Sequence, residues 1–190
     1  MYGGAVEIRT PDPPLSDGVV TLRPWTVDDV EAIARACNEP EIARWIHQMP
    51  SPYGKRDARE YVTATQTAWD EGAGAFFAIV DAAGGEPVGS IAIHVQDAAW
   101  GNVEVGYWTA AEARGRGLTT RALRLISRWA MEQAGAERVQ LRADVHNTAS
   151  LRVAEKAGFI REGTLRSAAY NQRQGRRIDY AVYSLIPGDD

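Results

Sequence analysis

The chain has 190 residues, of which 45% are hydrophobic and 24% charged, so it is long enough for one domain with a complete core. Its 21 basic and 25 acidic residues give a net charge of −4, which argues against nucleic acid as a partner because no basic excess is present to neutralise phosphates. A single cysteine excludes an internal disulfide, and the three scattered histidines lack metal-ligand spacing, so we expect no metal. No apolar run has the length of a membrane span and no signal sequence is recognisable, so we expect a cytoplasmic protein with no membrane partner.

The first part of the chain is predicted to be an arm followed by a strand and helices. Residues 1–17 are rich in glycine and proline and are expected to form an extended N-terminal arm, with one domain over residues 18–190. The expected elements up to residue 71 are a strand over 19–23, a helix capped at Thr26 that runs to about residue 37, a helix that starts at Pro40, and a helix over 55–71.

The rest of the chain alternates strand and helix patterns. The expected elements are strands over 75–80, 87–95 and 102–109, a helix after residue 117, a strand over 138–145, a helix capped at Asn147 that runs to residue 157, a strand that starts at Phe159, and a strand over 178–186. This order predicts an α/β (α+β) fold in which a single mixed sheet carries helices on both faces.

A glycine-rich turn over residues 113–117 leads directly into the amphipathic helix that follows it. Gly115 and Gly117 let the backbone curl and let a ligand approach without meeting a Cβ atom. The start of the helix presents unbonded N–H groups and the positive end of its dipole, which favours a phosphate or pyrophosphate. A Walker loop is excluded because no lysine follows the glycines, and a dinucleotide fingerprint lacks its third glycine. A plain turn before a surface helix is an alternative at this point.

Four segments together resemble one family. Residues 114–119 (Arg-Gly-Arg-Gly-Leu-Thr) are similar to the R/Q-x-x-G-x-G/A loop of the GNAT acyltransferases, although Thr119 stands where glycine or alanine is preferred. Residues 147–163 resemble the N-x-x-S…E-K-x-G-F…G segment of the RimJ/RimL group of ribosomal-protein N-terminal acetyltransferases. Residues 104–108 (Glu-Val-Gly-Tyr-Trp) resemble the E-I-G-Y-W strand of that group, and residues 175–179 its closing G-x-x-x-D hairpin. The resemblance covers the chain from about residue 19 to its end.

The resemblance implies a mostly antiparallel sheet that is splayed between strands 102–109 and 138–145, with acetyl-CoA lying in the opening. Separated strands expose backbone groups that are costly when unbonded, and the two amides of a pantetheine arm can pair with them. The expected contacts to acetyl-CoA are the backbone of Trp108, Thr109 and Ala110 together with Asn147 for the pantetheine, and Arg114, Gly115, Arg116, Gly117, Leu118 and Thr119 for the pyrophosphate.

Acyl transfer to an amine needs a neutral amine, a stabilised oxyanion and a proton for the departing thiolate. Glu104 is the candidate base because it lies on the strand beside the expected thioester; an ordinary solvated carboxylate is the alternative. A backbone N–H near Val105 or Gly106 is the candidate oxyanion donor. The resemblance implies Ser150 as proton donor, with unaided thiolate release as its rival. His94 is interpreted as a packing residue.

These residues predict acetyl transfer from acetyl-CoA to a primary amine, which is either a protein N-terminus or a small amine. The alternatives are a CoA-binding sensor or scaffold without turnover, and the same fold with another donor such as succinyl-CoA. The helices before Phe76 and residues 166–177 are expected to shape the acceptor pocket. A homodimer is a further expectation.

Overall fold

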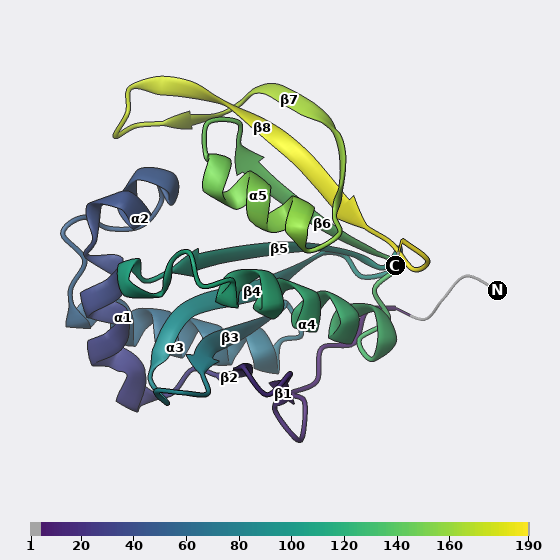
Figure 1. The fold of residues 1–190 in the computed structure, drawn as a ribbon, viewed down its shortest axis with the longest axis horizontal. Coiled ribbons are helices and arrows are strands. Elements are labelled where there is room, and N and C mark those ends of the chain that lie inside the picture. The colour runs from purple at the N-terminus through teal and green to yellow at the C-terminus, as the bar shows by residue number, and fades with distance from the viewer. Residues whose placement is uncertain (1–4, 190) are drawn as a thin grey trace.

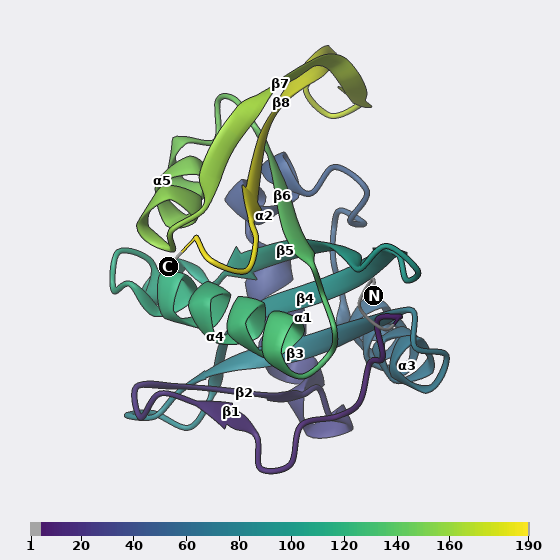
Figure 2. The same ribbon diagram turned by 90° about the vertical axis from the view of Figure 1, so that its right-hand side faces the viewer.

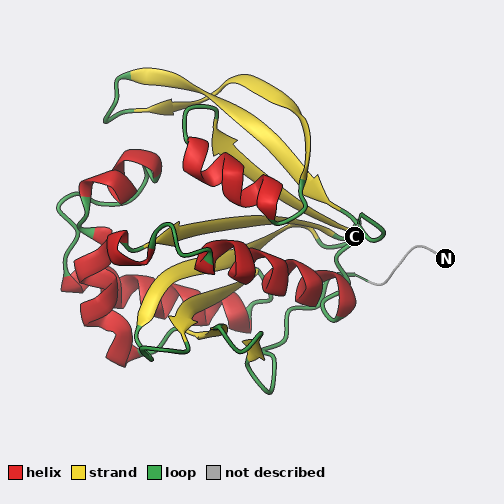
Figure 3. Ribbon diagram, viewed as in Figure 1, coloured by secondary structure: helices red, strands yellow, loops and turns green. Residues whose placement is uncertain are grey.

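A computed structural model describes residues 5–189, and residues 1–4 of the expected arm lie outside this range. Its centre is an eight-stranded sheet with the order β1-β2-β3-β4-β5-β6-β8-β7. The strands are β1 (Leu15–Ser16), β2 (Val20–Pro24), β3 (Gly74–Asp81), β4 (Pro87–Asp97), β5 (Asn102–Thr109), β6 (Arg138–Asp144), β7 (Ile160–Asn171) and β8 (Arg176–Leu185). The helices are α1 (Val30–Cys37), α2 (Pro40–Trp45), α3 (Lys55–Asp70), α4 (Leu118–Glu132) and α5 (Thr148–Lys156), and single 3₁₀ turns cover Val27–Asp29 and Ala111–Ala113. Figure 1 and Figure 3 show this arrangement.

Helices cover both faces of the sheet, as the element order predicts. Helix α4 packs on one face of the strands β2 to β6, whereas α1 and α3 pack on the other face (Figure 2). One side of α4 is fully buried, with Ala122, Leu123 and Ile126 at 0% exposure, because its apolar residues recur at helical spacing. The alternating residues of the strands supply the matching surface, for example Phe77 and Ile91.

A second, smaller apolar cluster lies on the opposite face of the sheet. It contains Trp25, Val30, Ile33, Cys37, Tyr53, Ala58 and Ala78. Trp25 stacks on Trp108 of β5 with ring centroids 6.1 Å apart, so this cluster supports the side chains that β5 presents on that face.

The sheet opens between β5 and β6, which are its one parallel pair among the described residues. Pairing is limited to three positions, of which Glu104 opposite Gln140 is the last. Beyond them β5 continues to Thr109 and β6 to Asp144 without pairing, and in Figure 1 the β6-β8-β7 half rises away from β5. The splayed, mostly antiparallel sheet implied by the resemblance is confirmed.

The described part of the arm is attached to the domain. Leu15 and Ser16 pair with β2, and the N–H of Val6 donates to Ala98 at 2.9 Å while its side chain is buried in the core. The hairpin of β7 and β8 behaves differently, because β7 is exposed along almost its whole length and extends away from the sheet (Figure 2).

Candidate active site

Two cavities lie in the opening between β5 and β6. The inner cavity, of about 510 Å³, reaches from Glu104 and His94 to Met49. The loop cavity, of about 690 Å³, reaches from the glycine turn at Gly115 to α5. Six residues line both of them: Trp45, Ile46, Tyr107, Trp108, Asn147 and Ser150. The two cavities therefore meet at this junction.

The glycine turn lines one end of the loop cavity with exposed backbone. Gly115 and Gly117 have φ values of +75° and +77°, which L-residues rarely adopt, and a Cβ built on either meets nothing within 4 Å. Gly117 precedes α4 without a side-chain cap, so the first N–H groups of this helix are free to bind a ligand. The turn fits a diphosphate, with the helix dipole adding attraction.

The other side chains of this turn are already engaged. Arg114 donates to both carboxylate oxygens of Glu39, and Arg116 lies 2.5 Å from Asp81. Leu118 is buried, and the Thr119 hydroxyl lies 2.6 Å from that of Thr109, which joins the end of β5 to the first turn of α4. A bound diphosphate would therefore meet mainly the backbone of residues 115–119, and the two arginines hold the turn in place.

Two basic side chains of α5 also line the loop cavity and are absent from the sequence prediction. Arg152 and Lys156 are exposed and lie one helical turn apart. Neither side chain has an acidic partner among residues 5–189. Their spacing of four residues is the signal that could have found them, because such a pair lies on one helix face. They are available to phosphate groups.

The free edge of β5 differs in part from the expectation. The N–H of Ala110 donates to the Val88 carbonyl at 2.9 Å, so it is used inside the sheet. The Trp108 carbonyl also faces β4, because its oxygen lies directly against Gly89 of that strand: a Cβ atom added to Gly89 would be 2.5 Å from it. Because backbone groups alternate between the two sides of a strand, Tyr107 and Thr109 point theirs toward the opening. Of the three residues expected to bind a pantetheine through their backbone, only Thr109 has this orientation. Its carbonyl accepts Arg114 Nε at 3.2 Å, so the N–H of Thr109 is the group left for a ligand.

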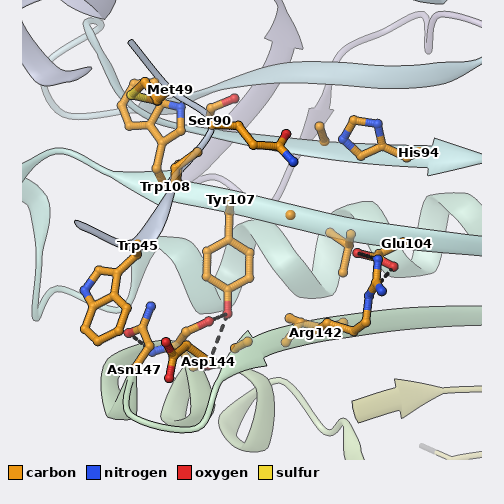
Figure 4. Close-up of a pocket in the computed structure, with 18 of the residues that line it drawn as sticks. Trp45, Met49, Ser90, His94, Glu104, Tyr107, Trp108, Arg142, Asp144 and Asn147 are labelled. Carbon is orange, nitrogen blue, oxygen red and sulfur yellow. Dashed lines mark hydrogen bonds and ion pairs between the residues drawn. The ribbon is translucent and has the colours of Figure 1, made fainter. Parts of the chain in front are cut away.

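Tyr107, Asn147 and Ser150 form a hydrogen-bonded group at the junction of the cavities. Figure 4 shows Tyr107 pointing from β5 toward the region of Asn147. The Tyr107 hydroxyl lies 2.9 Å from Ser150 Oγ and 3.1 Å from the Ser150 carbonyl oxygen. Asn147 caps α5 by accepting the Ser150 N–H at 3.2 Å. Burial raises the pKa of Tyr107 to about 12, against the opposing effect of its bond to Ser150, so the phenol stays neutral. The sequence prediction includes Asn147 and Ser150 as site residues but not Tyr107, which the fold places beside them.

Glu104 lies at the point where β5 and β6 separate, and it is ion-paired. Arg142 Nε approaches one carboxylate oxygen at 2.8 Å and Arg142 Nη2 the other at 3.0 Å, while Gln140 donates at 3.2 Å. His94 lies opposite Glu104 on β4 and packs edge-to-face on Phe76 at 5.0 Å. Burial lowers the pKa of His94, against the opposing effect of Glu104, so the imidazole is neutral at pH 7. Both side chains line the inner cavity (Figure 4).

The remaining wall of the inner cavity is largely aromatic and apolar. Trp45 and Met49 come from α2 and the segment after it, Tyr61 from α3, and Ile178 and Tyr180 from β8. The helices before Phe76 therefore shape this cavity, as the sequence suggested.

Residues 166–177, also expected to shape it, act from outside. Arg173 donates to the carbonyls of Ala43 at 2.8 Å, of Ile46 at 3.2 Å, and of Met49. The side chains of Asn171 and Gln174 both donate to the Arg44 carbonyl at 3.1 Å. The tip of the β7–β8 hairpin is thus tied to the end of α2 and to the segment that carries Met49.

Comparison with known proteins gives the same result as the geometry. The splayed sheet and the glycine turn at one end of its opening are the features that the resemblance to acyltransferases implied. The model of the family described as "Acetyltransferase (GNAT) domain" matches residues 20–160, and the chain belongs to this family. It is therefore an acetyltransferase.

Relatives support this assignment over most of the chain. The chain is 30% identical over 174 residues to YdaF of Bacillus subtilis (strain 168), an inferred ribosomal N-acetyltransferase, covering 88% of this chain and 91% of YdaF. It is 23% identical over 167 residues to the N-acetyltransferase p20 of Bacillus licheniformis, covering 88% of this chain and 92% of p20. The structure of Mycobacterium smegmatis RimJ in complex with CoA-disulfide superposes with a TM-score of 0.81 at 22% identity, covering 97% of this chain and 87% of RimJ, which shows a shared fold.

Residues 5–189 contain neither a cluster of metal-ligating side chains nor a membrane-spanning helix. No group of three or more histidine, cysteine, aspartate or glutamate side chains is placed to hold a metal ion. No helix in this range is long and apolar enough to cross a membrane.

Proposed function

We propose that the protein transfers an acetyl group from acetyl-CoA to a primary amine, which is a protein N-terminus or a small amine. The observation that carries this proposal is the junction at which the two cavities meet. A donor whose diphosphate lies on the glycine turn can extend through the loop cavity toward Ser150 and Tyr107. An amine in the inner cavity then approaches the same point from the side of Glu104.

The chain's own residues have separate roles in this reaction. The N–H groups of residues 115–119 hold the diphosphate of acetyl-CoA, and Arg152 and Lys156 offer positive charge to the remaining phosphate of that molecule. The N–H of Thr109 and the side chain of Asn147 contact the pantetheine. Glu104 accepts a proton from the attacking amine, directly or through water. The N–H of Val105, beside the open position of Gly106, stabilises the oxyanion.

Ser150 acts on the leaving group. As the carbon–nitrogen bond forms and the carbon–sulfur bond breaks, the Ser150 hydroxyl gives its proton to the departing thiolate, directly or through a water molecule, and the free thiol leaves. The serine then regains a proton from solvent, and the proton lost by the amine stays on Glu104 until it too exchanges with solvent. Tyr107 orients Ser150 because its hydroxyl lies within hydrogen-bond distance of both the Ser150 carbonyl oxygen and Ser150 Oγ. When the single phenol hydrogen is donated to Ser150 Oγ, the serine hydrogen is free to point at the thiolate.

Acetyl is favoured over an acidic acyl group such as succinyl. Among the described residues, Arg142 is the one cationic side chain in the wall of the inner cavity, and its guanidinium is paired with Glu104. It therefore offers no free charge to a donor carboxylate.

The proposal is tested by measuring free thiol released from acetyl-CoA in the presence of amine acceptors, together with binding of CoA by calorimetry. A sensor or scaffold would bind CoA and release no thiol. An enzyme releases thiol in an amine-dependent manner.

The variant Gly117→Val places a branched side chain where the diphosphate approaches, and we expect it to lose CoA binding by at least about a hundredfold because the amide contacts are blocked. The control Gly72→Val has the same kind of strain, since Gly72 has φ +66° and an open Cβ position, but it lies at the end of α3. The Gly72→Val variant should keep its affinity for CoA. Equal affinity in the two variants would remove the glycine turn from the proposal.

A further inference from the structure

The charges in the wall of the inner cavity are balanced within the protein. The charged side chains that line it are Glu104, Arg142 and Asp144. Glu104 is held by both ends of the Arg142 guanidinium. The Asp144 carboxylate lies 2.5 Å from Arg176 and also accepts the His146 N–H at 2.9 Å. Neither carboxylate is left without a cationic partner.

The neighbouring surfaces add no unpartnered negative charge to this space. The carboxylate that lines the adjoining loop cavity, Glu41, accepts from Trp45 Nε1 at 2.8 Å and lies 3.7 Å from Arg44. His94 is neutral, and the tyrosines Tyr61 and Tyr107 have pKa values raised by burial to about 12. The rest of the wall consists largely of apolar and aromatic side chains such as Trp45, Phe76 and Ile178. A second ammonium group in this cavity would lose water and find no free carboxylate, which is unfavourable.

We infer that the inner cavity takes a primary amine attached to an apolar or aromatic group, and that it rejects acceptors with a second positive charge close to the reacting nitrogen. This inference rests on the proposed function and names its acceptor class. Polyamines and other multiply charged amines are excluded by it. A small monoamine and a polypeptide N-terminus with an apolar first residue share the accepted chemistry.

Matched acceptors test the inference. The first pair is n-butylamine and 1,4-diaminobutane, which differ in a single added amino group. The second pair is a short peptide amide that begins with phenylalanine and the same peptide beginning with lysine. We expect kcat/KM, measured by thiol release, to be at least about tenfold higher for the singly charged member of a pair. Turnover of the amine pair would identify small amines as the acceptors, and turnover of the peptide pair would identify polypeptide N-termini.

Two variants change the charge of the wall in opposite directions. Arg176→Gln leaves the Asp144 carboxylate without its guanidinium partner, so the preference against the second ammonium should shrink to within about threefold. Asp144→Asn leaves Arg176 uncompensated, so the preference should grow. CoA affinity, measured by calorimetry, should stay unchanged in both variants because neither residue lines the loop cavity.

The outcomes separate the two levels of the proposal. Amine-dependent thiol release that is equal for both members of each pair, or greater for the diamine, overturns the acceptor class and leaves the acetyltransferase function standing. CoA binding without thiol release for any of the four acceptors overturns the proposed function, and the acceptor class with it.

Discussion

Tyr107 is assigned a role in positioning Ser150 because of where the fold places its hydroxyl. Its hydroxyl contacts Ser150 at the junction of the cavities. Removing that hydroxyl in Tyr107→Phe should lower kcat about five- to tenfold, the value of one hydrogen bond of about 1 kcal/mol, and leave KM for acetyl-CoA unchanged. Because Tyr107 acts through Ser150, the double variant Tyr107→Phe/Ser150→Ala should be no slower than Ser150→Ala alone.

Tyr61 provides the matched control for this measurement. It is a buried tyrosine of the inner cavity whose hydroxyl lies 3.0 Å from Ser90 Oγ, and burial raises its pKa to about 12 as well. Tyr61→Phe should keep kcat within about twofold, since Tyr61 does not contact Ser150. Additive effects of the Tyr107 and Ser150 changes would show that the tyrosine acts on packing alone.

Glu104 is the second residue whose role can be measured. Glu104→Gln should lower turnover by about a hundredfold or more with little change in CoA affinity, because it removes a proton acceptor from the inner cavity. Its control is Glu162→Gln, which breaks a similar two-point ion pair to Arg138 of the same strand β6 and lies in neither cavity wall. A normal rate in Glu104→Gln at saturating amine would transfer the base assignment to His94.

At the scale of elements, the tip of the β7–β8 hairpin determines how firmly α2 is held. Arg173→Ala removes donors from the carbonyls of Ala43, Ile46 and Met49. We expect KM for the amine to rise about three- to tenfold while CoA affinity is retained, because Trp45 and Met49 in the cavity wall become mobile. Amide hydrogen exchange of residues 43–49 should accelerate in the same variant.

Arg177→Ala is the control for the hairpin. Arg177 lies on the same hairpin but donates within it, to Ser167. Its loss should leave both the KM for the amine and the exchange of residues 43–49 unchanged. The same effect in both variants would mean that the hairpin as a whole, and not the Arg173 contacts, stabilises α2.

At the scale of the whole molecule, several carboxylates make stability sensitive to acid. The pKa of Glu162 is lowered to about 2 by Arg138 and Ser184, and the pKa of Asp81 is lowered by the Ala83 N–H and Arg116. In Asp29, burial opposes the shift, but Arg23 and Thr26 lower the pKa overall. A depressed pKa in the folded state means that the stabilisation is present above the unfolded value and is lost as the pH falls.

For Glu162 the relevant window runs from its ordinary value of 4.5 down to about 2. Denaturant unfolding should therefore show a steady loss of stability below about pH 4.5, and Glu162→Gln should flatten part of that decline. The variant should cost less than about 1 kcal/mol at pH 7, because the Glu162 side chain is 41% exposed and its ion pair is screened by solvent. Identical pH profiles for the variant and the parent would contradict this account.

The sequence was sufficient for the order of elements from residue 19 onward and for the conformation of the glycine turn that we propose as the donor site; the short strand β1 was not expected. Gly115 and Gly117 are adjacent to the helix that they precede, and their positive φ values follow from local geometry that only glycine readily adopts. The same holds for Asn147, which caps α5 within its own turn. The family pattern placed the opening of the sheet between the correct strands.

Only the tertiary structure decided which side chains are free to act. Arg114 and Glu39 are 75 positions apart, Tyr107 and Ser150 are 43 apart, and Arg173 and Ala43 are 130 apart, so no periodicity relates them. Whether Ala110 or Thr109 offers its backbone to a ligand likewise depends on the strand register, which a shift of one residue would reverse. Local patterns encode the conformation of a segment, but the neutralisation of one charge by another depends on their distance in space, and only the folded chain sets that distance.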